Sequence, residues 1–320
     1  MPVATKRSRK PLPKVVCIVG ATSSGKTTLG IQIAQAFDGE VVNADARQIY
    51  RHVSIGTGKP TGASKLYKRR YRAFMYKGIP HYLMDFLPPT EQYSVSEWKA
   101  SAMKAIKGIV KRKHLPIVVG GTGLYISSIV DNLEIPEVPP QILFRKEFES
   151  KTLDELVHFL LHLDPEAAAF IDLKNKRRVI RALEIMTFTG EKISLSRKKG
   201  PPLVDVLQIG IDYSMEELTE RTSKAIDGMI EQGLFSEVEA LMEAQIPDTS
   251  PAFTSIGYPG IIKSLRGEIS RDEAINNLKK LTRAYVKRQI TWFKRDPRIV
   301  WVKSRDEGVE VVRKWLAGQV

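Results

Sequence analysis

Cysteine and long apolar runs are scarce in this sequence of 320 residues, and each scarcity excludes a class of protein. The single cysteine, Cys17, permits neither a disulfide framework nor a zinc site built from cysteines. No apolar run approaches the roughly 20 residues that a membrane-spanning helix needs. We therefore expect no membrane partner and a reducing compartment, the cytoplasm.

The N-terminal segment also lacks acidic residues and an apolar stretch. Because a secretory signal needs such a stretch after its basic residues, we do not expect one here. We interpret residues 1–14 as a disordered basic arm. An organellar transit peptide is the alternative interpretation of the same composition.

Acidic residues are fewer than basic ones along the whole chain. Fifty Lys and Arg against 36 Asp and Glu give a formal net charge of +14. The basic residues cluster at 65–77, 174–181, 197–199 and 283–295, and several clusters contain Tyr, Trp or Phe. Basic side chains neutralise phosphates and aromatic rings stack on unpaired bases. The pattern favours a nucleic acid partner over a protein that is simply basic.

The octapeptide from Gly20 to Thr27 is the most informative motif, because it fits the pattern G-x-x-x-x-G-K-[ST]. The apolar run 15–19 before it is typical of a buried parallel strand, and residues 28–34 after it have helical spacing. This arrangement of a strand, a glycine-containing turn and a helix N-terminus directs several backbone N–H groups toward one anion. The motif therefore predicts a site for a diphosphate or triphosphate.

The remaining pattern indicates an α/β fold, a P-loop NTPase-like parallel sheet core with a helical insertion domain. Further strands are expected at 40–44, 115–119, 206–211 and 298–302. A helix is expected from Ser94 to about Lys113, because Ser94 and Glu97 form a capping-box pattern. Helical periodicity runs from 144 to 189. We assign the core to 15–130 and 204–320, the latter with C-terminal helices, and the insertion to 131–203.

A carboxylate is absent where a nucleotide-hydrolysing P-loop enzyme would hold Mg²⁺, at the end of a later strand. The strand at 115–119 ends in Gly120-Gly121-Thr122 instead. Asp45 follows the second strand, and the carboxyl ends of parallel strands line the ligand crevice of such sheets. Asp45 is a candidate site residue on this ground, and a simple turn carboxylate is the alternative.

Several motifs occur together and in order along the chain. They are Gly20–Thr27, Asn43–Tyr50, Ile55–Pro60, Ile79–Asp85, Tyr93–Val95, Gly120–Tyr125, Arg177–Glu184, Ser255–Tyr258 and Thr282–Phe293. In this order, from about residue 15 to 302, they resemble the tRNA dimethylallyltransferases of bacterial type. The phosphate motif alone would be weak evidence for that family, whereas the ordered set is strong.

The resemblance implies a prenyl transferase. Such enzymes move a dimethylallyl group from dimethylallyl diphosphate to N6 of the adenosine 3′ of the anticodon (position 37) and release diphosphate. The residues implied to bind the diphosphate are Gly20, Ala21, Thr22, Ser23, Ser24, Gly25, Lys26 and Thr27. Thr27 and Ser24 would hold Mg²⁺. The implied catalytic residues are Asp45 as the base, Lys26, Thr122 and Arg221.

The resemblance also implies contacts with a tRNA anticodon stem-loop by an enzyme expected to be a monomer. The implied tRNA-binding residues are Asp45, Ala46, Arg47, Gln48, Thr122, Arg145, Arg177, Arg178, Arg181, Ser255, Gly257, Tyr258 and Arg288. Two departures stand out. Ala46 replaces a serine that usually follows the aspartate, and Ala225 replaces the second of two arginines four residues apart.

Three alternative functions remain open from the sequence. An adenylate isopentenyltransferase would prenylate free AMP, but those relatives are shorter and carry less of the basic RNA-binding machinery. A P-loop kinase of a small metabolite would use the same phosphate motif. A nucleotide-regulated RNA-binding protein would need no prenyl transfer at all.

Overall fold

The computed structural model describes residues 11–68, 71–195 and 198–319, which form two compact units. The first unit combines the chain up to Ile126 with the chain from Leu203 onward, and the second is Ser127–Pro202. The sequence places the helical insertion at 131–203. Most of the predicted basic arm, residues 1–10, lies outside the described residues.

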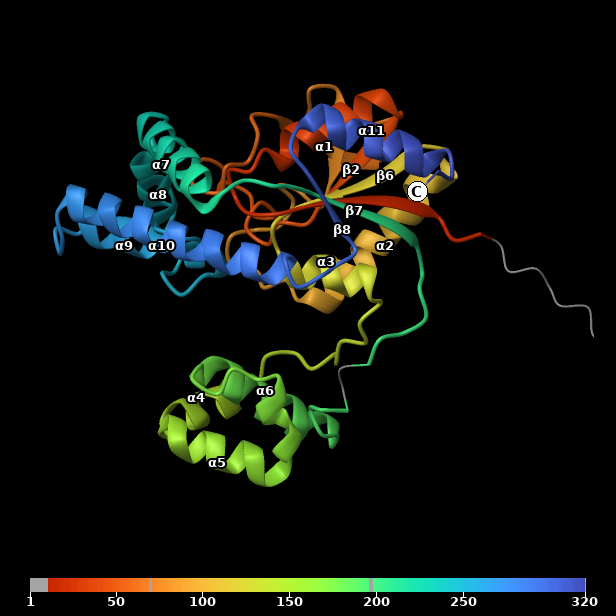
Figure 1. Ribbon diagram of the computed structural model, residues 1–320. Helices are drawn as coiled ribbons and strands as arrows, with labels where there is room; N and C mark the ends of the chain where they lie inside the picture. The colour runs from red at the N-terminus through yellow and green to blue at the C-terminus, as the bar shows by residue number, and fades with distance from the viewer. Residues whose placement is uncertain (1–10, 69–70, 196–197, 320) are drawn as a thin grey trace, which may run out of the picture. The chain divides into compact units, whose positions relative to one another are not determined.

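The first unit is built on one eight-stranded sheet (Figure 1). Its order is β3-β4-β5-β2-β6-β1-β7-β8. The strands are β1 (Lys14–Val19), β2 (Gly39–Asn43), β3 (Ala63–Tyr67), β4 (Tyr71–Tyr76), β5 (Ile79–Tyr82), β6 (Leu115–Val119), β7 (Asp205–Ile211) and β8 (Ile299–Val302). From β5 to β8 all neighbours pair in parallel, whereas β3, β4 and β5 pair antiparallel.

The parallel part confirms the fold class expected from the sequence. Residues 15–19 of β1 are fully buried, because strands inside a parallel sheet are covered on both faces and need apolar side chains throughout. The five expected strands correspond to β1, β2, β6, β7 and β8 within one or two residues at each end. The antiparallel edge of β3 to β5 was not expected from the sequence.

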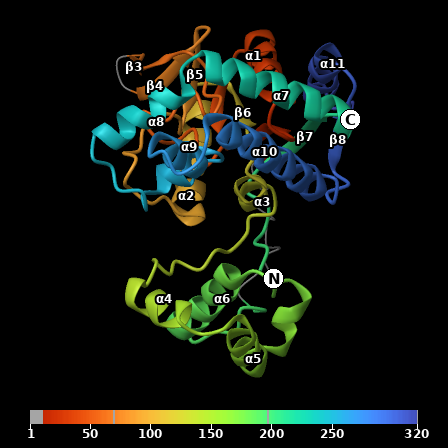
Figure 2. The same ribbon diagram turned by 90° about the vertical axis from the view of Figure 1, so that its left-hand side faces the viewer.

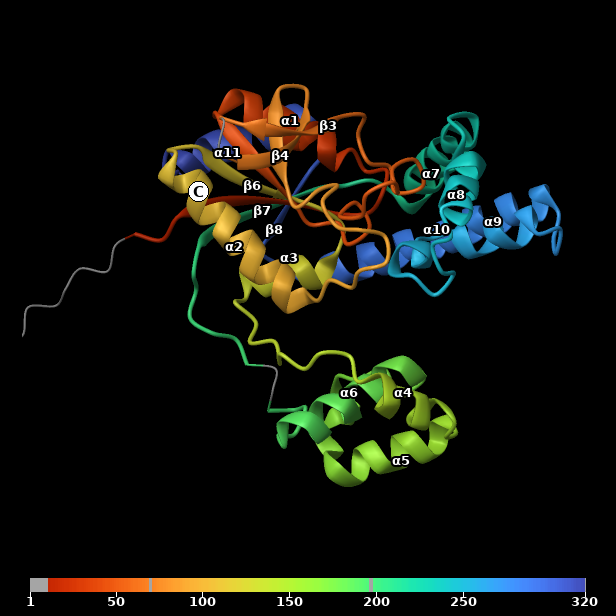
Figure 3. The same ribbon diagram turned by 180° about the vertical axis from the view of Figure 1, so that it is seen from behind.

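Helices cover both faces of this sheet. The helices α1 (Lys26–Ala36) and α11 (Arg305–Leu316) contact each other and lie on one face, whereas α2 (Val95–Lys111) and α3 (Gly123–Val130) lie on the other, as the views from front and back show (Figures 1 and 3). The Ser94 side chain accepts a hydrogen bond from the Glu97 N–H at 3.1 Å, and Glu97 returns one to Ser94. This confirms the predicted capping box.

Four further helices pack on one another beside the sheet (Figure 2). They are α7 (Met215–Glu231), α8 (Leu234–Glu243), α9 (Tyr258–Leu265) and α10 (Arg271–Phe293), with the 3-10 helix η2 (Pro251–Thr254) before α9. Their shared core includes Ile226, Val238, Phe253 and Leu278. Because residues 49–55 also pack on this core, the helices support the loop that follows β2.

The second unit has its own apolar core. Its helices are α4 (Ile142–Glu149), α5 (Leu153–Leu163), the 3-10 helix η1 (Pro165–Ala169) and α6 (Lys176–Thr189). Leu156, Leu160 and Leu183 are fully buried among them. A separate core of this kind is what allows a segment to form a compact unit of its own.

Candidate active site

The phosphate motif forms a tight turn between β1 and α1. Gly20, Ser23 and Gly25 have φ angles of 135°, 60° and 83°, in the region that favours glycine. Gly25 is the N-cap residue of α1, so no side chain occupies the first N–H groups of this helix. These groups and the positive end of the helix dipole are available to an anion.

Lys26 opens α1 and lies at the centre of this turn. Its Nζ donates a hydrogen bond to the Ala21 carbonyl at 2.5 Å. Burial lowers the pKa of Lys26 to about 8, and the negative charge of Asp45 offsets part of that effect. A partly buried lysine such as Lys26 gains more from a bound polyanion than a fully exposed one, because less solvent screens the interaction.

Asp45 is held in place by hydrogen bonds to its backbone and its carboxylate. The buried Asn43 side chain accepts from the Asp45 N–H at 3.2 Å and donates to the Asp45 carbonyl at 3.1 Å. The carboxylate Oδ1 accepts from the Arg47 N–H at 2.8 Å. The second Asn43 donor contact, to the Leu83 carbonyl at 2.9 Å, ties this turn to the end of β5.

The glycine pair after β6 lies directly against the Asp45 turn. A Cβ on Gly120 would stand 2.1 Å from the Ala44 carbonyl oxygen, so only glycine fits. The Thr122 N–H donates to that same oxygen at 3.1 Å, and the Thr122 hydroxyl accepts from the Ala46 N–H at 3.0 Å. Thr122 therefore holds the loop that carries Asp45.

Gln289 of α10 connects the phosphate turn to the glycine pair, a role that motif reading missed. Its Oε1 accepts from the Thr22 N–H at 2.9 Å, and its Nε2 donates to the Gly121 carbonyl at 2.9 Å. Gln289 is 5% exposed. The sequence places Gln289 in the basic stretch 283–295, which favours RNA contact, whereas the structure buries it on the inner face of α10, where it makes both hydrogen bonds.

Arg221 of α7 reaches the phosphate turn from the other side. Its Nε donates to the Ser23 carbonyl at 3.0 Å, and its guanidinium lies 4.6 Å from the centre of the Tyr213 ring. Lys224 and Ala225 follow on the same helix and line the same cavity as Arg221. The position of the missing second arginine, Ala225, therefore does face the site.

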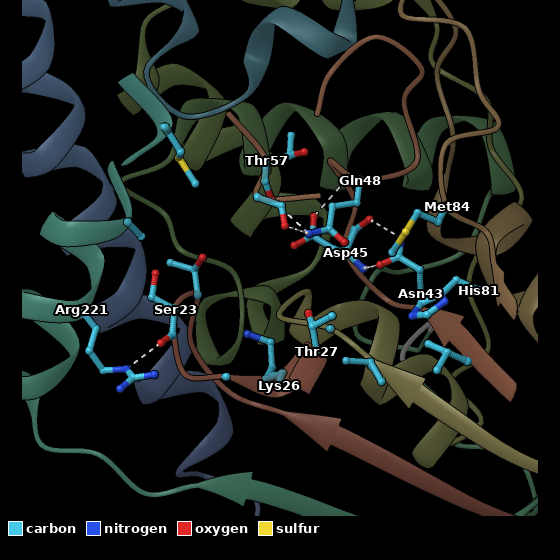
Figure 4. Close-up of a pocket in the computed structure, with 18 of the residues that line it drawn as sticks. Ser23, Lys26, Thr27, Asn43, Asp45, Gln48, Thr57, His81, Met84 and Arg221 are labelled. Carbon is cyan, nitrogen blue, oxygen red and sulfur yellow. Dashed lines mark hydrogen bonds between the residues drawn. The ribbon is translucent and has the colours of Figure 1, made fainter. Parts of the chain in front are cut away.

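These elements surround a cavity of about 510 Å³. Figure 4 shows Arg221 at one end, Lys26 and Thr27 in the middle, and Met84 with His81 at the other end. Asp45 and Gln48 also line it. One cavity thus brings together a phosphate-binding turn, three cationic residues (Lys26, Arg221 and Lys224) and a single carboxylate.

Of the other residues predicted to bind the diphosphate or the metal, some line the cavity and others do not. Thr22, Ser23, Gly25 and Thr27 line the cavity, whereas Ser24 is 1% exposed and does not. The Ser24 hydroxyl has no hydrogen-bond partner within the described part of the chain. Nor does that part hold a cluster of three or more His, Cys, Asp or Glu residues suited to a metal.

The predicted RNA-binding residues of the first unit differ in exposure. Arg288 is exposed, and its guanidinium lies 5.7 Å from the Tyr285 ring centre. Arg47 donates to the Pro251 carbonyl at 3.0 Å, and Gln48 donates to the Thr57 carbonyl at 3.1 Å. Both therefore brace the loop after β2.

Ser255 and Tyr258 are buried, at 1% and 0% exposure, so the structure gives their side chains a packing role. The Tyr258 hydroxyl donates to Glu237 at 2.6 Å. Glu237 in turn accepts hydrogen bonds from the backbone N–H groups of Ser54, Ile55 and Gly56. Gly257 has a φ of 90° and supplies the turn that starts α9.

In the second unit, four predicted arginines fall into two pairs. Arg145 makes two hydrogen bonds, of 2.8 and 2.7 Å, to the buried carboxylate of Glu184, and Arg181 pairs with the same carboxylate. These contacts hold the pKa of Glu184 at about 2 against the opposing effect of burial. Arg177 and Arg178 are exposed on α6 and suit contact with a polyanion.

Helices able to cross a membrane are absent from the ranges 11–68, 71–195 and 198–319.

Comparison with known proteins identifies the family. The family model described as IPP transferase matches residues 48–296, and the one described as Isopentenyl transferase matches 13–78. A tRNA dimethylallyltransferase of Acetivibrio thermocellus is 40% identical over 303 residues, which cover 92% of this chain and 93% of the relative. One of Carboxydothermus hydrogenoformans is 37% identical, with 93% and 94% covered.

Solved structures agree with these sequence matches. A tRNA isopentenylpyrophosphate transferase from Bacillus halodurans is similar with a TM-score of 0.67 and 32% identity, and 96% of each chain is covered. A eukaryotic dimethylallyltransferase acting on tRNA has a TM-score of 0.77 and 26% identity, with 96% of this chain and 80% of that chain covered. On these matches and the geometry of its cavity, the chain belongs to the IPP transferase family, as its motifs predicted.

Proposed function

We propose that this protein transfers a dimethylallyl group from dimethylallyl diphosphate to N6 of the adenosine at position 37 of tRNA. The observation that carries the proposal is the shared cavity of the phosphate turn and Asp45. The strand β6 is followed by the glycine pair Gly120-Gly121, at the position where a nucleotide-hydrolysing P-loop enzyme has a carboxylate. The cavity thus suits a diphosphate leaving group and a single proton acceptor.

The diphosphate is bound by the N–H groups at the start of α1, by Lys26 and by Arg221. As the allylic C1–O bond breaks, its electron pair leaves with the diphosphate, which gains negative charge. Fixed cations and N–H dipoles stabilise that charge, and such preorganised electrostatics are the largest catalytic effect in many enzymes.

Asp45 takes the proton from the acceptor amine. The N6 lone pair forms the new bond to C1, and the N6 proton, acidic only as that bond forms, passes to the Asp45 carboxylate. Asn43 holds the Asp45 backbone and the Arg47 N–H holds its carboxylate, so little reorganisation is needed when N6 arrives. General-base catalysis of this kind contributes about 10²- to 10⁴-fold.

Magnesium fits this site through Thr27. The Thr27 side chain lines the cavity beside Lys26 and Asp45, whereas Ser24 is buried away from it. In phosphate loops of this pattern the Ser/Thr hydroxyl after the lysine is a ligand of Mg²⁺, and phosphate oxygens and water complete its shell. When bound, it would neutralise part of the diphosphate charge. Of the two predicted ligands, we keep Thr27.

The tRNA is the partner that the charge of +14 favours. We assign its backbone contacts to exposed arginines, Arg288 in the first unit and Arg177 and Arg178 in the second. The acceptor adenosine must leave its stack to reach the cavity, which costs only a few kcal/mol in a single-stranded loop. We further propose that the protein acts as a monomer in the cytoplasm.

One assay tests the proposal against the alternatives. Purified protein is incubated with labelled dimethylallyl diphosphate, Mg²⁺ and undermodified tRNA, and in parallel with AMP, while ATP hydrolysis is measured separately. Label on tRNA alone is expected. Label on AMP would favour an adenylate isopentenyltransferase. ATP hydrolysis without prenyl transfer would favour a kinase or a nucleotide-regulated RNA-binding protein.

A further inference from the structure

The active-site cavity has a neighbour with which it shares a wall. A second cavity, of about 240 Å³, lies beside the antiparallel edge of the sheet, and Phe74 and Phe86 line it together with the charged residues Arg51, Arg72 and Asp85. His81 and Met84 line both this cavity and the first one of about 510 Å³. Their side chains therefore separate the two spaces.

The two wall residues differ in how firmly they are held. The His81 Nδ1 donates to the Ile79 carbonyl at 3.0 Å, and burial lowers the pKa of His81 to about 4, so the ring is neutral. Its ring also packs edge-on against Tyr76. Met84 is 5% exposed and fills space with a flexible, unbranched side chain. Met84 is therefore the part of the wall that a substitution can remove.

The wall stands at the end of the active-site cavity away from the cations. In Figure 4, Met84 and His81 lie across the cavity from Arg221, with Lys26 between. Val41 and Val119 line the same cavity. A prenyl chain whose diphosphate is bound at Lys26 and Arg221 finds apolar surface at this end, which favours its burial there.

We infer that Met84 limits the prenyl donor to five carbons, and that a smaller residue at this position opens the second cavity to a ten-carbon chain. The inference rests on the proposed function, because it names the prenyl end of the same site. A longer chain that runs toward this end would press on Met84 and His81, and overfilling packed side chains in this way displaces them and the backbone, which is why an intact wall rejects the longer donor.

The chemistry is the same for both donors. The N6 lone pair attacks C1, the C1–O bond breaks, its electron pair leaves with diphosphate, and the N6 proton passes to Asp45. Only the far end of the chain differs. A change of donor preference therefore reports on the wall and not on the reacting atoms.

The test compares dimethylallyl diphosphate with geranyl diphosphate, the ten-carbon allylic donor, on unmodified tRNA. Wild type, Met84→Ala and Met229→Ala are assayed, and the modified nucleoside is identified by its mass. Met229 lines the first cavity but not the second, so it is the matched control. We expect Met84→Ala to raise the geranyl-to-dimethylallyl ratio of kcat/KM by roughly 10-fold or more. Met229→Ala should leave that ratio near the wild-type value.

A refilling variant makes the test sharper. Ser64 pairs with Phe74 across β3 and β4, and Phe74 pairs with His81 across β4 and β5, so the three side chains share one face. Ser64 lines the second cavity only. Adding Ser64→Phe to Met84→Ala should remove most of the gained geranyl transfer and preserve dimethylallyl transfer.

Two results would overturn the inference. One is a folded Met84→Ala protein that transfers the five-carbon group while its donor ratio is unchanged. The other is an equal rise in Met229→Ala. If Met84→Ala does not fold, Met84→Val removes less volume and should give a smaller rise, and an unchanged ratio there also overturns it. Absence of any transfer by the wild type would instead refute the proposed function.

Discussion

The Gln289 side chain accepts a hydrogen bond from the Thr22 N–H at 2.9 Å, although 267 residues separate the two in sequence. The same side chain donates to the Gly121 carbonyl. A Cβ on Gly121 would stand 2.2 Å from the Gln289 Nε2, so the contact requires glycine there. The shape of the phosphate turn therefore depends on a helix from the far end of the chain.

Replacing Gln289 by methionine should weaken diphosphate binding. Methionine has a similar length but leaves the Gly121 carbonyl and the Thr22 N–H without their partner, at about 1–3 kcal/mol for the buried carbonyl and less for the partly buried N–H. We expect KM for dimethylallyl diphosphate to rise by roughly 10-fold, and kcat to fall less, in steady-state kinetics. Lys287→Met, on the exposed side of α10, is the control and should not change KM for this donor. An unchanged KM in Gln289→Met would contradict the bridging role.

The lowered pKa of Lys26 predicts an alkaline limit to donor capture. Lys26 is charged below its pKa of about 8 and loses that charge as pH rises through it. Because the diphosphate needs the cation, kcat/KM for dimethylallyl diphosphate should be level from about neutral pH to pH 8 and fall above it. A pH profile measures this directly.

Lys26→Arg is the control for that profile, since a guanidinium stays charged across the range. This variant should be slower overall and should lack the limb near pH 8. If kcat/KM of Lys26→Arg still falls above pH 8 as it does in the wild type, the group that titrates there is not Lys26.

The two arginine pairs of the second unit should respond differently to substitution. Arg177→Gln and Arg178→Gln remove exposed charges, so each should weaken tRNA binding and reduce the slope of log K against log salt by about 1. Filter binding over a salt series measures both. Arg145→Gln, in contrast, takes a partner from buried Glu184 and should lower the melting temperature. If the slope of log K against log salt is the same in these variants as in the wild type, Arg177 and Arg178 do not contact the tRNA.

Much of the fold was accessible from the sequence, because its signals are local. The all-apolar run 15–19 predicts a buried parallel strand, and Ser94 with Glu97 predicts a helix start, and both are confirmed. The edge from β3 to β5 was missed. Residues 63–67 are mostly exposed and contain polar side chains, so no apolar alternation marks them as a strand. Only pairing with β4 makes them one.

The candidate site divides in the same way. The turn from Gly20 to Thr27 and Asp45 could be named from motif and position, and the structure brings them to one cavity. Their catalytic roles stay predictions. The hydrogen bonds of Gln289 and the wall formed by Met84 could not be predicted from the sequence. Each depends on how segments far apart in the chain pack together, and no sequence motif links those segments. The burial of Tyr258 likewise follows from the packing of α8, α9 and α10 and not from its motif.

The most direct measurement is single-turnover prenyl transfer by Asp45→Ala. The variant is loaded with labelled dimethylallyl diphosphate and mixed with an unmodified anticodon stem-loop. Because Asp45 acts on the N6 proton, we expect transfer to slow by about 10²- to 10⁴-fold while the donor still binds and the melting transition is retained. Transfer at a near wild-type rate by folded Asp45→Ala would contradict the role of Asp45 as the base of this reaction.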